Sequence, residues 1–158
     1  MTSQTTDLLT DRARVIIEHL AKGDRRNETA HILDISRSSL RREIATACRK
    51  LNIPVRSTAA VNSAISKGII SLPPGEPVDL TKEQIDVLRL IAAGHDTREL
   101  AVIYGIATNT VKYHVGRIMK ALGAKNRAHA VALGWQRGIL GPPEKPPSSS
   151  APAASPAG

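Results

Sequence analysis

The sequence predicts an all-α protein made of two tandem four-helix units. Apolar residues recur at helical spacing, and one succession of apolar residues and helix-end signals occurs twice, about 71 residues apart. Aromatic residues are almost absent, because the chain has one Trp, two Tyr and no Phe. Small aliphatic side chains must therefore fill the cores, and these suit short helices that pack closely together.

The clearest helix is expected at residues 108–123. One set of apolar residues has the i, i+4, i+7, i+11 spacing of a buried helical face. This set is Val111, Val115, Ile118 and Leu122. The opposite face offers cations for phosphates and side chains able to contact base edges. It consists of Asn109, Lys112, Tyr113, Gly116, Arg117 and Lys120. A short helix and a tight turn precede this segment, so it is predicted to be the recognition helix of a helix-turn-helix motif.

Three further helices are expected in the same unit. The pairs Thr81/Gln84 and Asp96/Glu99 have the spacing of capping boxes and predict where the first two helices begin. Glycine favours the left-handed conformation in which many helices end. The first three helices are expected to end at Gly94, Gly105 and Gly123. The fourth helix is expected at about 127–137.

A second copy of this plan is expected earlier in the chain, with weaker signals. Corresponding identical residues include Leu9/Leu80, Gly23/Gly94, Glu28/Glu99, Ile35/Ile106, Leu51/Leu122 and Arg56/Arg127. Thr10 has no reciprocal Glu or Gln, and Arg25 stands where the second copy has Asp96. Each missing cap costs about 1 kcal/mol. We interpret the pattern as a duplication with a less stable first unit, in which 37–52 corresponds to 108–123.

These signals divide the chain into five segments. We expect a flexible start at 1–8, a degenerate helix-turn-helix unit at 9–70, a Pro/Gly linker at 71–79, a second helix-turn-helix unit at 80–141 and a disordered Pro/Ser/Ala-rich tail at 142–158. The linker, SLPPGEPVD, has three prolines and is expected to be stiff and extended.

Charge and composition narrow the function classes. The formal net charge is +8, and residues 1–70 carry +5 of it, from twelve Lys or Arg against seven Asp or Glu. Such a small basic helical protein is typical of nucleic-acid binding. The single Cys48 is expected in a core, and the histidines have no ligand-type spacing, so neither a metal nor a cofactor is expected. No signal peptide, membrane span or catalytic cluster is evident, so we expect a cytoplasmic, nucleoid-associated protein that is not an enzyme.

With these motifs in place, residues 80–140 resemble the LuxR-type DNA-binding domain of bacterial regulators, also called FixJ/NarL or GerE-type. The most specific match is TVKYHV at 110–115. The initial LT, RELA in the second helix, ALG at the end of the third and NRAHAV at the start of the fourth follow in the same order. Two departures are Ala107, where Ser or Thr usually caps the third helix, with Thr108 as a substitute cap, and Gly116, where many relatives have a longer side chain.

The resemblance implies double-stranded DNA as the partner, with helix 108–123 in the major groove. The DNA-binding residues that it implies are Thr108, Asn109, Thr110, Lys112, Tyr113, His114, Arg117, Lys120, Lys125 and Arg127. A packing role for His114 is the alternative to base reading. Relatives often dimerise through the fourth helix, so Val131, Leu133 and Trp135 are either core residues or a self-association surface.

The first unit matches the family less closely. Its possible DNA-binding face consists of Ser36, Arg37, Ser38, Arg41, Arg42 and Arg49. Ser36 keeps the helix cap, and Arg41 and Arg42 replace Lys112 and Tyr113. Glu43 replaces the histidine, and a carboxylate there is unfavourable near phosphate.

Two classes of function remain open. The first is a stand-alone, sequence-specific transcriptional regulator without a sensor domain, acting as a homodimer or as an intramolecular pseudo-dimer. The second is an interaction protein that pairs with another LuxR-type regulator or with RNA polymerase. A partner resembling sigma region 4 is disfavoured by the segment NRAHAVALGWQRG, which fits the fourth LuxR-type helix.

Overall fold

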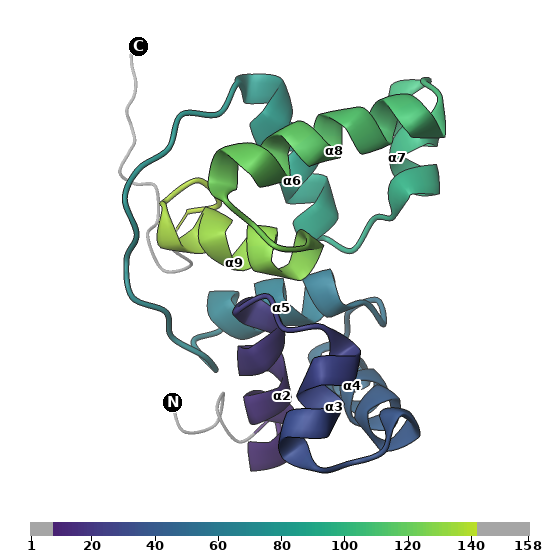
Figure 1. Cartoon of the computed structure of the whole chain (residues 1–158), viewed down its shortest axis with the longest axis vertical. Coiled ribbons are helices and arrows are strands. Elements are labelled where there is room, and N and C mark those ends of the chain that lie inside the picture. The colour runs from purple at the N-terminus through teal and green to yellow at the C-terminus, as the bar shows by residue number, and fades with distance from the viewer. Residues whose placement is uncertain (1–7, 142–158) are drawn as a thin grey trace.

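The computed structural model describes residues 8–141, and within that range it contains eight α-helices and no strand. The predicted all-α class is confirmed. The helices form two groups of four, one above the other in Figure 1. The expected tail at 142–158 and most of the expected flexible start lie outside the described residues.

Corresponding helices of the two groups have equal lengths. The first group consists of α2 (Asp11–Ala21), α3 (Arg26–Leu33), α4 (Arg37–Leu51) and α5 (Ser57–Ser66). The second consists of α6 (Lys82–Ala92), α7 (Thr97–Tyr104), α8 (Thr108–Leu122) and α9 (Arg127–Gln136). In each group the lengths are 11, 8, 15 and 10 residues. This agreement supports the interpretation of a duplication.

Local hydrogen bonds account for the helix starts. Both predicted capping boxes form: Gln84 N donates to Thr81 Oγ1 over 3.1 Å, and Glu99 N donates to Asp96 Oδ1 over 2.9 Å, with the reciprocal bonds also made. In the first group, Arg25 has no acceptor to offer the start of α3. The helices therefore begin where the sequence predicts, with weaker capping in the first group.

Helix ends show the same difference between the groups. Helices α7 and α8 end in left-handed glycines, Gly105 and Gly123. At the equivalent ends of α3 and α4 stand Asp34 and Asn52, with φ of 56° and 60°. A side chain in the left-handed region costs about 1–2 kcal/mol per residue, less for Asp and Asn than for bulkier residues. Helices α3 and α4 thus have weaker signals at their C-terminal ends than α7 and α8.

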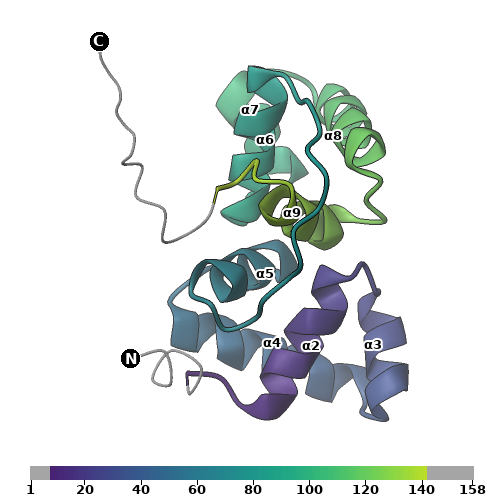
Figure 2. The same ribbon diagram turned by 90° about the vertical axis from the view of Figure 1, so that its left-hand side faces the viewer.

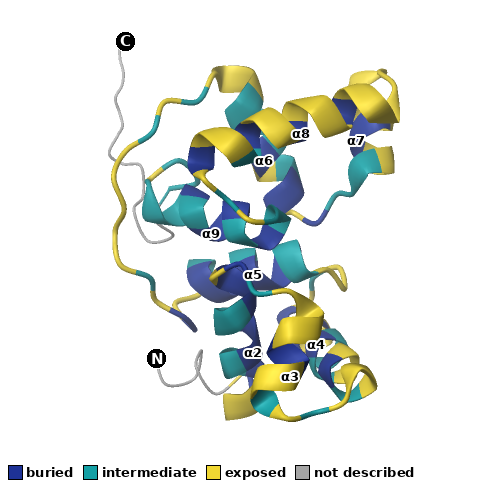
Figure 3. Ribbon diagram, viewed as in Figure 1, coloured by how far each residue is buried: buried dark blue, intermediate teal, exposed yellow. Residues whose placement is uncertain are grey.

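The two groups share one apolar core. Helix α5 packs against α9 at the centre of the molecule, where Figure 3 shows both ribbons mainly buried or half-buried. Ala60 and Val61 of α5 and Val131 of α9 are 0% exposed and belong to one cluster of buried side chains. We call this contact between the two groups the junction.

The junction has approximate two-fold character. The backbone at Gly23 lies against the side chains of Lys125 and His129, and the equivalent Gly94 lies against Pro54 and Ala59. The partners also correspond in the repeat, Lys125 to Pro54 and His129 to Ala59. Equivalent surfaces of the two groups therefore face each other, as in a symmetric dimer.

Polar bonds join the groups as well. Trp135 Nε1 donates to Asn62 Oδ1 over 2.8 Å, and Asn126 Nδ2 donates to the Gly23 carbonyl over 2.9 Å. The linker runs past α9 along the outside of the molecule in Figure 2, where Gly75 N donates to the Gln136 carbonyl over 2.8 Å. Within residues 8–141, no helix combines the length and apolarity needed to cross a membrane.

Candidate nucleic-acid interface

Helix α8 is held from one side by the second group. The predicted apolar stripe is buried, because Val111, Val115, Ile118 and Leu122 are each 1–4% exposed. The turn from α7 is closed by Ile106 N, which donates to the Ala101 carbonyl over 3.1 Å. The rest of the helix surface faces outwards, as the exposed upper side of α8 shows in Figure 3.

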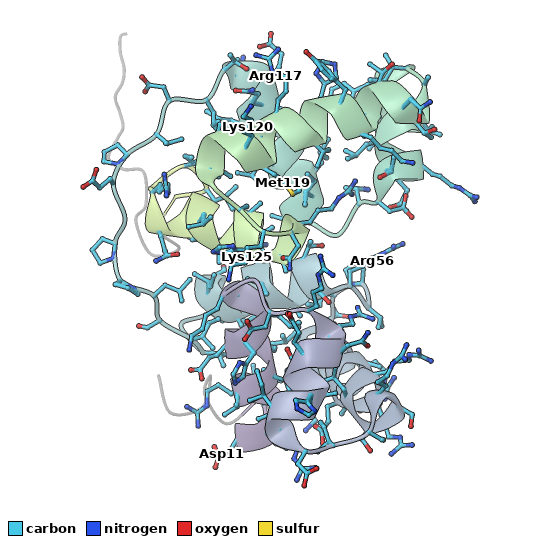
Figure 4. The ribbon with its side chains drawn as sticks, viewed as in Figure 1. Asp11, Arg56, Arg117, Met119, Lys120 and Lys125 are labelled. Carbon is cyan, nitrogen blue, oxygen red and sulfur yellow. The ribbon has the colours of Figure 1, made fainter. Side chains whose placement is uncertain are left out.

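The outward surface carries the predicted polar residues. All eight of those on α8 are exposed: Thr108, Asn109, Thr110, Lys112, Tyr113, His114, Arg117 and Lys120. In Figure 4 the side chains of Arg117 and Lys120 point away from the body of the molecule. Arg117 also pairs with Tyr113, since its Nη1 donates to Tyr113 Oη over 3.3 Å and its guanidinium lies 5.8 Å from the ring centroid. This pairing holds both side chains over the same part of the helix.

The surroundings of His114 are compatible with both expected roles, packing and base reading. It is exposed, yet it lines a cavity of about 260 Å³ between α6, α7 and α8, whose other lining residues include Val87, Leu100 and Ile118. Its ring packs edge-on to Tyr113, with 5.6 Å between the centroids. These contacts fit a packing role for one side of the ring and leave the other side free.

The first turn of α8 has no side-chain cap. Ala107 is the N-cap residue and makes no cap bond. The suggestion that Thr108 substitutes is wrong, because Thr108 is already the first helical residue and no side-chain cap bond forms at this end. Helix α4 differs, since Ser36 Oγ accepts from Ser39 N over 3.0 Å. The first-turn N–H groups of α8 are consequently open to an external acceptor such as a phosphate.

Two predicted residues lie away from the α8 surface. Lys125 lies beside Gly23 of the first group. Arg127, half-buried at the start of α9, donates to Thr97 Oγ1. Burial lowers the pKa of Arg127, and the neighbouring Asp96 partly offsets that effect. Both residues therefore lie beside the first group rather than on the outward surface of α8, because Lys125 contacts Gly23 and Arg127 lines a cavity with residues of both groups.

The first group presents a similar surface on α4. Its apolar stripe of Leu40, Ile44, Ala47 and Leu51 is buried. The predicted polar residues are all exposed: Ser36, Arg37, Ser38, Arg41, Arg42 and Arg49. Arg49 Nη2 donates to Thr46 Oγ1 over 3.2 Å, whereas Arg37, Arg41 and Arg42 form no ion pair within residues 8–141. Helices α4 and α8, which have equal lengths, thus both carry exposed basic side chains.

One exposed feature was missed from the sequence. Helix α7 and the turn after it leave large apolar side chains on the surface, with Val102 82% and Ile103 50% exposed. Tyr104 and Ile106 continue this apolar patch. A short helix that is apolar on more than one face was the available signal, since only one face of α7 can be buried against α8.

Comparison with known proteins identifies the second group. Residues 78–133 match the profile of the family described as bacterial regulatory proteins, luxR family. Residues 78–133 form a LuxR-family domain. This segment includes α6, α7, α8 and most of α9, so the outward surface of α8 lies within the LuxR-family domain.

Similar proteins are bacterial regulators. The chain is 36% identical over 69 residues to transcriptional activator protein EchR of Dickeya chrysanthemi, an alignment covering 44% of this chain and 28% of that protein. It is 42% identical over 62 residues to transcriptional activator protein PhzR of Pseudomonas fluorescens, covering 37% and 25% respectively. It is 38% identical over 61 residues to transcriptional regulatory protein YdfI of Bacillus subtilis (strain 168), covering 39% and 29%.

The chain therefore spans less than a third of the length of these relatives. No solved structure matches it significantly. The match to the LuxR-family profile ends at residue 133, and residues 9–70 lie outside it. The interpretation of those residues as a second, degenerate copy stays a prediction.

The residues proposed for dimerisation of the LuxR-family domain lie in α9. Val131 is buried in the shared core, and Trp135 bonds to Asn62 of the first group. Leu133 packs against a smaller cluster that includes Leu88 and Ile118. In this chain the surface of α9 is occupied by α5. Among the described residues, no group of three or more His, Cys, Asp or Glu is placed to hold a metal ion.

His129 of α9 predicts a pH dependence of folding. Burial lowers the pKa of His129, with Lys125 and Arg137 acting in the same direction and Asp24 opposing them. Its Nδ1 accepts a bond from Lys125 N over 3.1 Å, which requires that nitrogen to be unprotonated. In the unfolded chain the pKa is about 6.5. As the pH falls below about 6.5, the unfolded state binds a proton more readily, so the free energy of unfolding should fall until the lowered folded pKa is passed.

Urea unfolding between about pH 7.5 and 5.5 measures this effect. His129→Gln should reduce the loss of stability on acidification. His31→Gln, at an exposed position of α3, should leave the loss unchanged. Equal pH profiles for wild type and His129→Gln would show that this histidine is not the group responsible.

Proposed function

We propose that the chain is a sequence-specific, duplex-DNA-binding transcription regulator whose helix α8 enters the major groove. The observation that carries the proposal is the exposed basic surface of α8 inside a LuxR-family domain, with its apolar side buried. The uncapped first turn and the Tyr113–Arg117 pair support it, because they offer phosphate and base-edge donors on one side of the helix.

We further propose that the chain acts as an intramolecular pseudo-dimer on an imperfect repeat. Helices α4 and α8 are equivalent in length and in their exposed basic residues, and the junction joins the groups with approximate two-fold character. Adjacent half-sites lie about 34 Å apart. The nine-residue linker reaches at most about 30 Å, which is compatible with such spacing because domain ends need not coincide with domain centres.

Lys112→Ala tests the recognition helix. The substitution should weaken binding to genomic DNA fragments by about 1–3 kcal/mol if Lys112 contacts a base, or lower the log–log salt slope by about 0.9 if it contacts a phosphate. Gel shifts at several salt concentrations measure both quantities. Lys67→Ala, which removes an exposed lysine at the end of α5, is the matched control. If the two variants bind alike, the assigned α8 surface is wrong.

The exposed apolar patch on α7 supports a second candidate function. An exposed patch of large apolar side chains commonly marks a protein interface. Under this alternative the chain pairs with another LuxR-type regulator or with RNA polymerase. The alternative gains support if the wild-type chain binds no DNA even at low salt and Val102→Asp abolishes co-purification with such a partner. It loses support if DNA binding is strong and Val102→Asp changes nothing.

A further inference from the structure

A cavity of about 640 Å³ lies at the junction, away from the exposed surface of α8. Four helices begin at its walls, α3 and α5 of the first group and α7 and α9 of the second. Its lining includes four arginines, namely Arg25, Arg26, Arg56 and Arg127. Figure 4 shows Arg56 at the level of the boundary between the two groups. Arginines from both groups thus line one cavity.

The carboxylates of the cavity do not neutralise these cations. Two aspartates line it, which leaves a surplus charge of +2. Asp24 Oδ2 lies 2.8 Å from His19 Nδ1, and Asp96 caps α7 while its Oδ2 lies 3.4 Å from Arg56 Nη1. Within residues 8–141, Arg25, Arg26 and Arg127 form no ion pair. Three guanidinium groups therefore share a cavity without a carboxylate of their own.

Two of these arginines are held in place by hydroxyl groups. Arg26 Nε and Nη2 donate to Ser57 Oγ over 3.1 and 2.9 Å, and Arg127 Nη2 donates to Thr97 Oγ1. When equivalent helices are aligned by their first residues, Arg26 of α3 corresponds to Thr97 of α7, and Ser57 of α5 corresponds to Arg127 of α9. For α5 and α9, this alignment is shifted by one residue from the sequence pairing of Arg56 with Arg127. Each group therefore has one arginine–hydroxyl pair at the same two positions. In the first group the arginine begins α3 and the serine begins α5, whereas in the second group the threonine begins α7 and the arginine begins α9. The pair fixes each guanidinium and still leaves N–H donors for a ligand.

The chemistry of this cavity suits a phosphate group. Guanidinium groups bind phosphate oxygens with two parallel N–H bonds, and the surplus charge matches a doubly charged anion. The start of α5 adds to this field, because its N-cap residue Arg56 makes no side-chain cap bond. Burial lowers the pKa of Arg127 because it disfavours the charged guanidinium, and a bound anion would offset that cost by electrostatic attraction.

We infer that the junction cavity is a phosphate-binding site formed jointly by the two groups. The phosphate has two possible sources, the backbone of duplex DNA passing between the two recognition helices or a free phosphorylated small molecule. Only the first source rests on the proposed function. This site is separate from the α8 surface, since the residues that line it lie at the starts of four helices from both groups.

The test uses the full chain and inorganic pyrophosphate as the probe. Isothermal titration calorimetry should show saturable binding that is at least tenfold weaker in Arg26→Gln and Arg127→Gln. Arg14→Gln, which removes an arginine paired with Asp11 on the surface of α2, should bind like wild type. In the wild-type protein, the arginine Nε–H resonances of the cavity should shift on titration, a readout that does not depend on the folding of variants. Absence of saturable binding, or equal binding by all variants, overturns the inference.

A DNA titration with and without saturating pyrophosphate separates the sources. A DNA backbone source predicts that pyrophosphate competes with DNA and that Arg26→Gln and Arg127→Gln each lower the salt slope by about 0.9. A free-phosphate source predicts arginine-dependent pyrophosphate binding with an unchanged DNA salt slope. If wild type binds pyrophosphate through these arginines but binds no DNA, the proposed function fails while this inference stands. If it binds DNA but no pyrophosphate, and the variants match wild type, the reverse holds.

Discussion

Replacing Val131 with aspartate should lower the free energy of unfolding by about 3–5 kcal/mol, since it leaves an unpaired charge in a dry interior. Val131 is 0% exposed and lies in the core shared by α9 and the first group. The arginines of the junction cavity have other partners, since Arg26 donates to Ser57 Oγ and Arg127 donates to Thr97 Oγ1. The carboxylate would either stay buried without a partner or separate α9 from α5.

Trp135 makes this prediction easy to measure. It is the only tryptophan of the chain, and its indole bonds to Asn62 across the junction, so its fluorescence reports contact between the groups. Urea unfolding should be followed by this fluorescence and by far-ultraviolet circular dichroism. Val102→Asp is the matched control, because Val102 is 82% exposed and its change should stay within about 0.5 kcal/mol. Similar losses in both variants would mean that the junction does not contribute to stability.

The sequence predicted the helices well because their signals are local. Capping boxes at Thr81 and Asp96, glycine ends and an apolar stripe all act within one or two turns of chain. The all-α class and the bounds of α8 follow from them within a residue. The exposed polar surface of α8 was predictable for the same reason, since a residue opposite the buried stripe of a helix must face outwards.

The junction was not predictable from such signals. Arg127 follows α8 closely in sequence, and the resemblance to the LuxR family implied a DNA contact beside that helix. In the structure it is half-buried, bonds to Thr97 and shares a cavity with Arg26 and Arg56, about 100 and 70 residues earlier. Whether a side chain faces DNA or a neighbouring unit depends on how the units pack, and helical periodicity carries no information about that.

Several residues near the contact between the two groups differ at equivalent positions. Arg25 stands where the second group has Asp96, and the arginine–hydroxyl pairs are reversed between Arg26–Ser57 and Thr97–Arg127. A symmetric pair of identical units would place either like charges or identical polar groups opposite each other. Within residues 8–141, the ion pair Arg56–Asp96 has no counterpart, because the equivalent N-cap positions hold Asn126 and Arg25. This ion pair across the junction therefore joins unlike partners, which favours contact within one chain over contact between copies of one unit.

Arg41→Ala/Arg42→Ala tests whether the first unit binds DNA together with the second. Both arginines are exposed on α4, at positions equivalent to Lys112 and Tyr113. If α4 occupies a second half-site, removing two phosphate contacts should lower the magnitude of the log–log salt slope by about 1.8 and weaken binding on the order of tenfold to a hundredfold at physiological salt. Gel shifts on fragments that contain one or two half-sites measure the effect.

The matched control is Arg12→Ala/Arg14→Ala, which removes the same charge from α2 of the same unit. A general electrostatic attraction would make the two double variants lose affinity equally, with the same change in slope. Contact through α4 predicts a loss confined to Arg41→Ala/Arg42→Ala and to fragments with two half-sites, because a single half-site engages only α8. If neither variant changes affinity on either fragment while Lys112→Ala does, the first unit does not touch DNA. Its role is then to cover α9, and the LuxR-family domain alone contacts DNA.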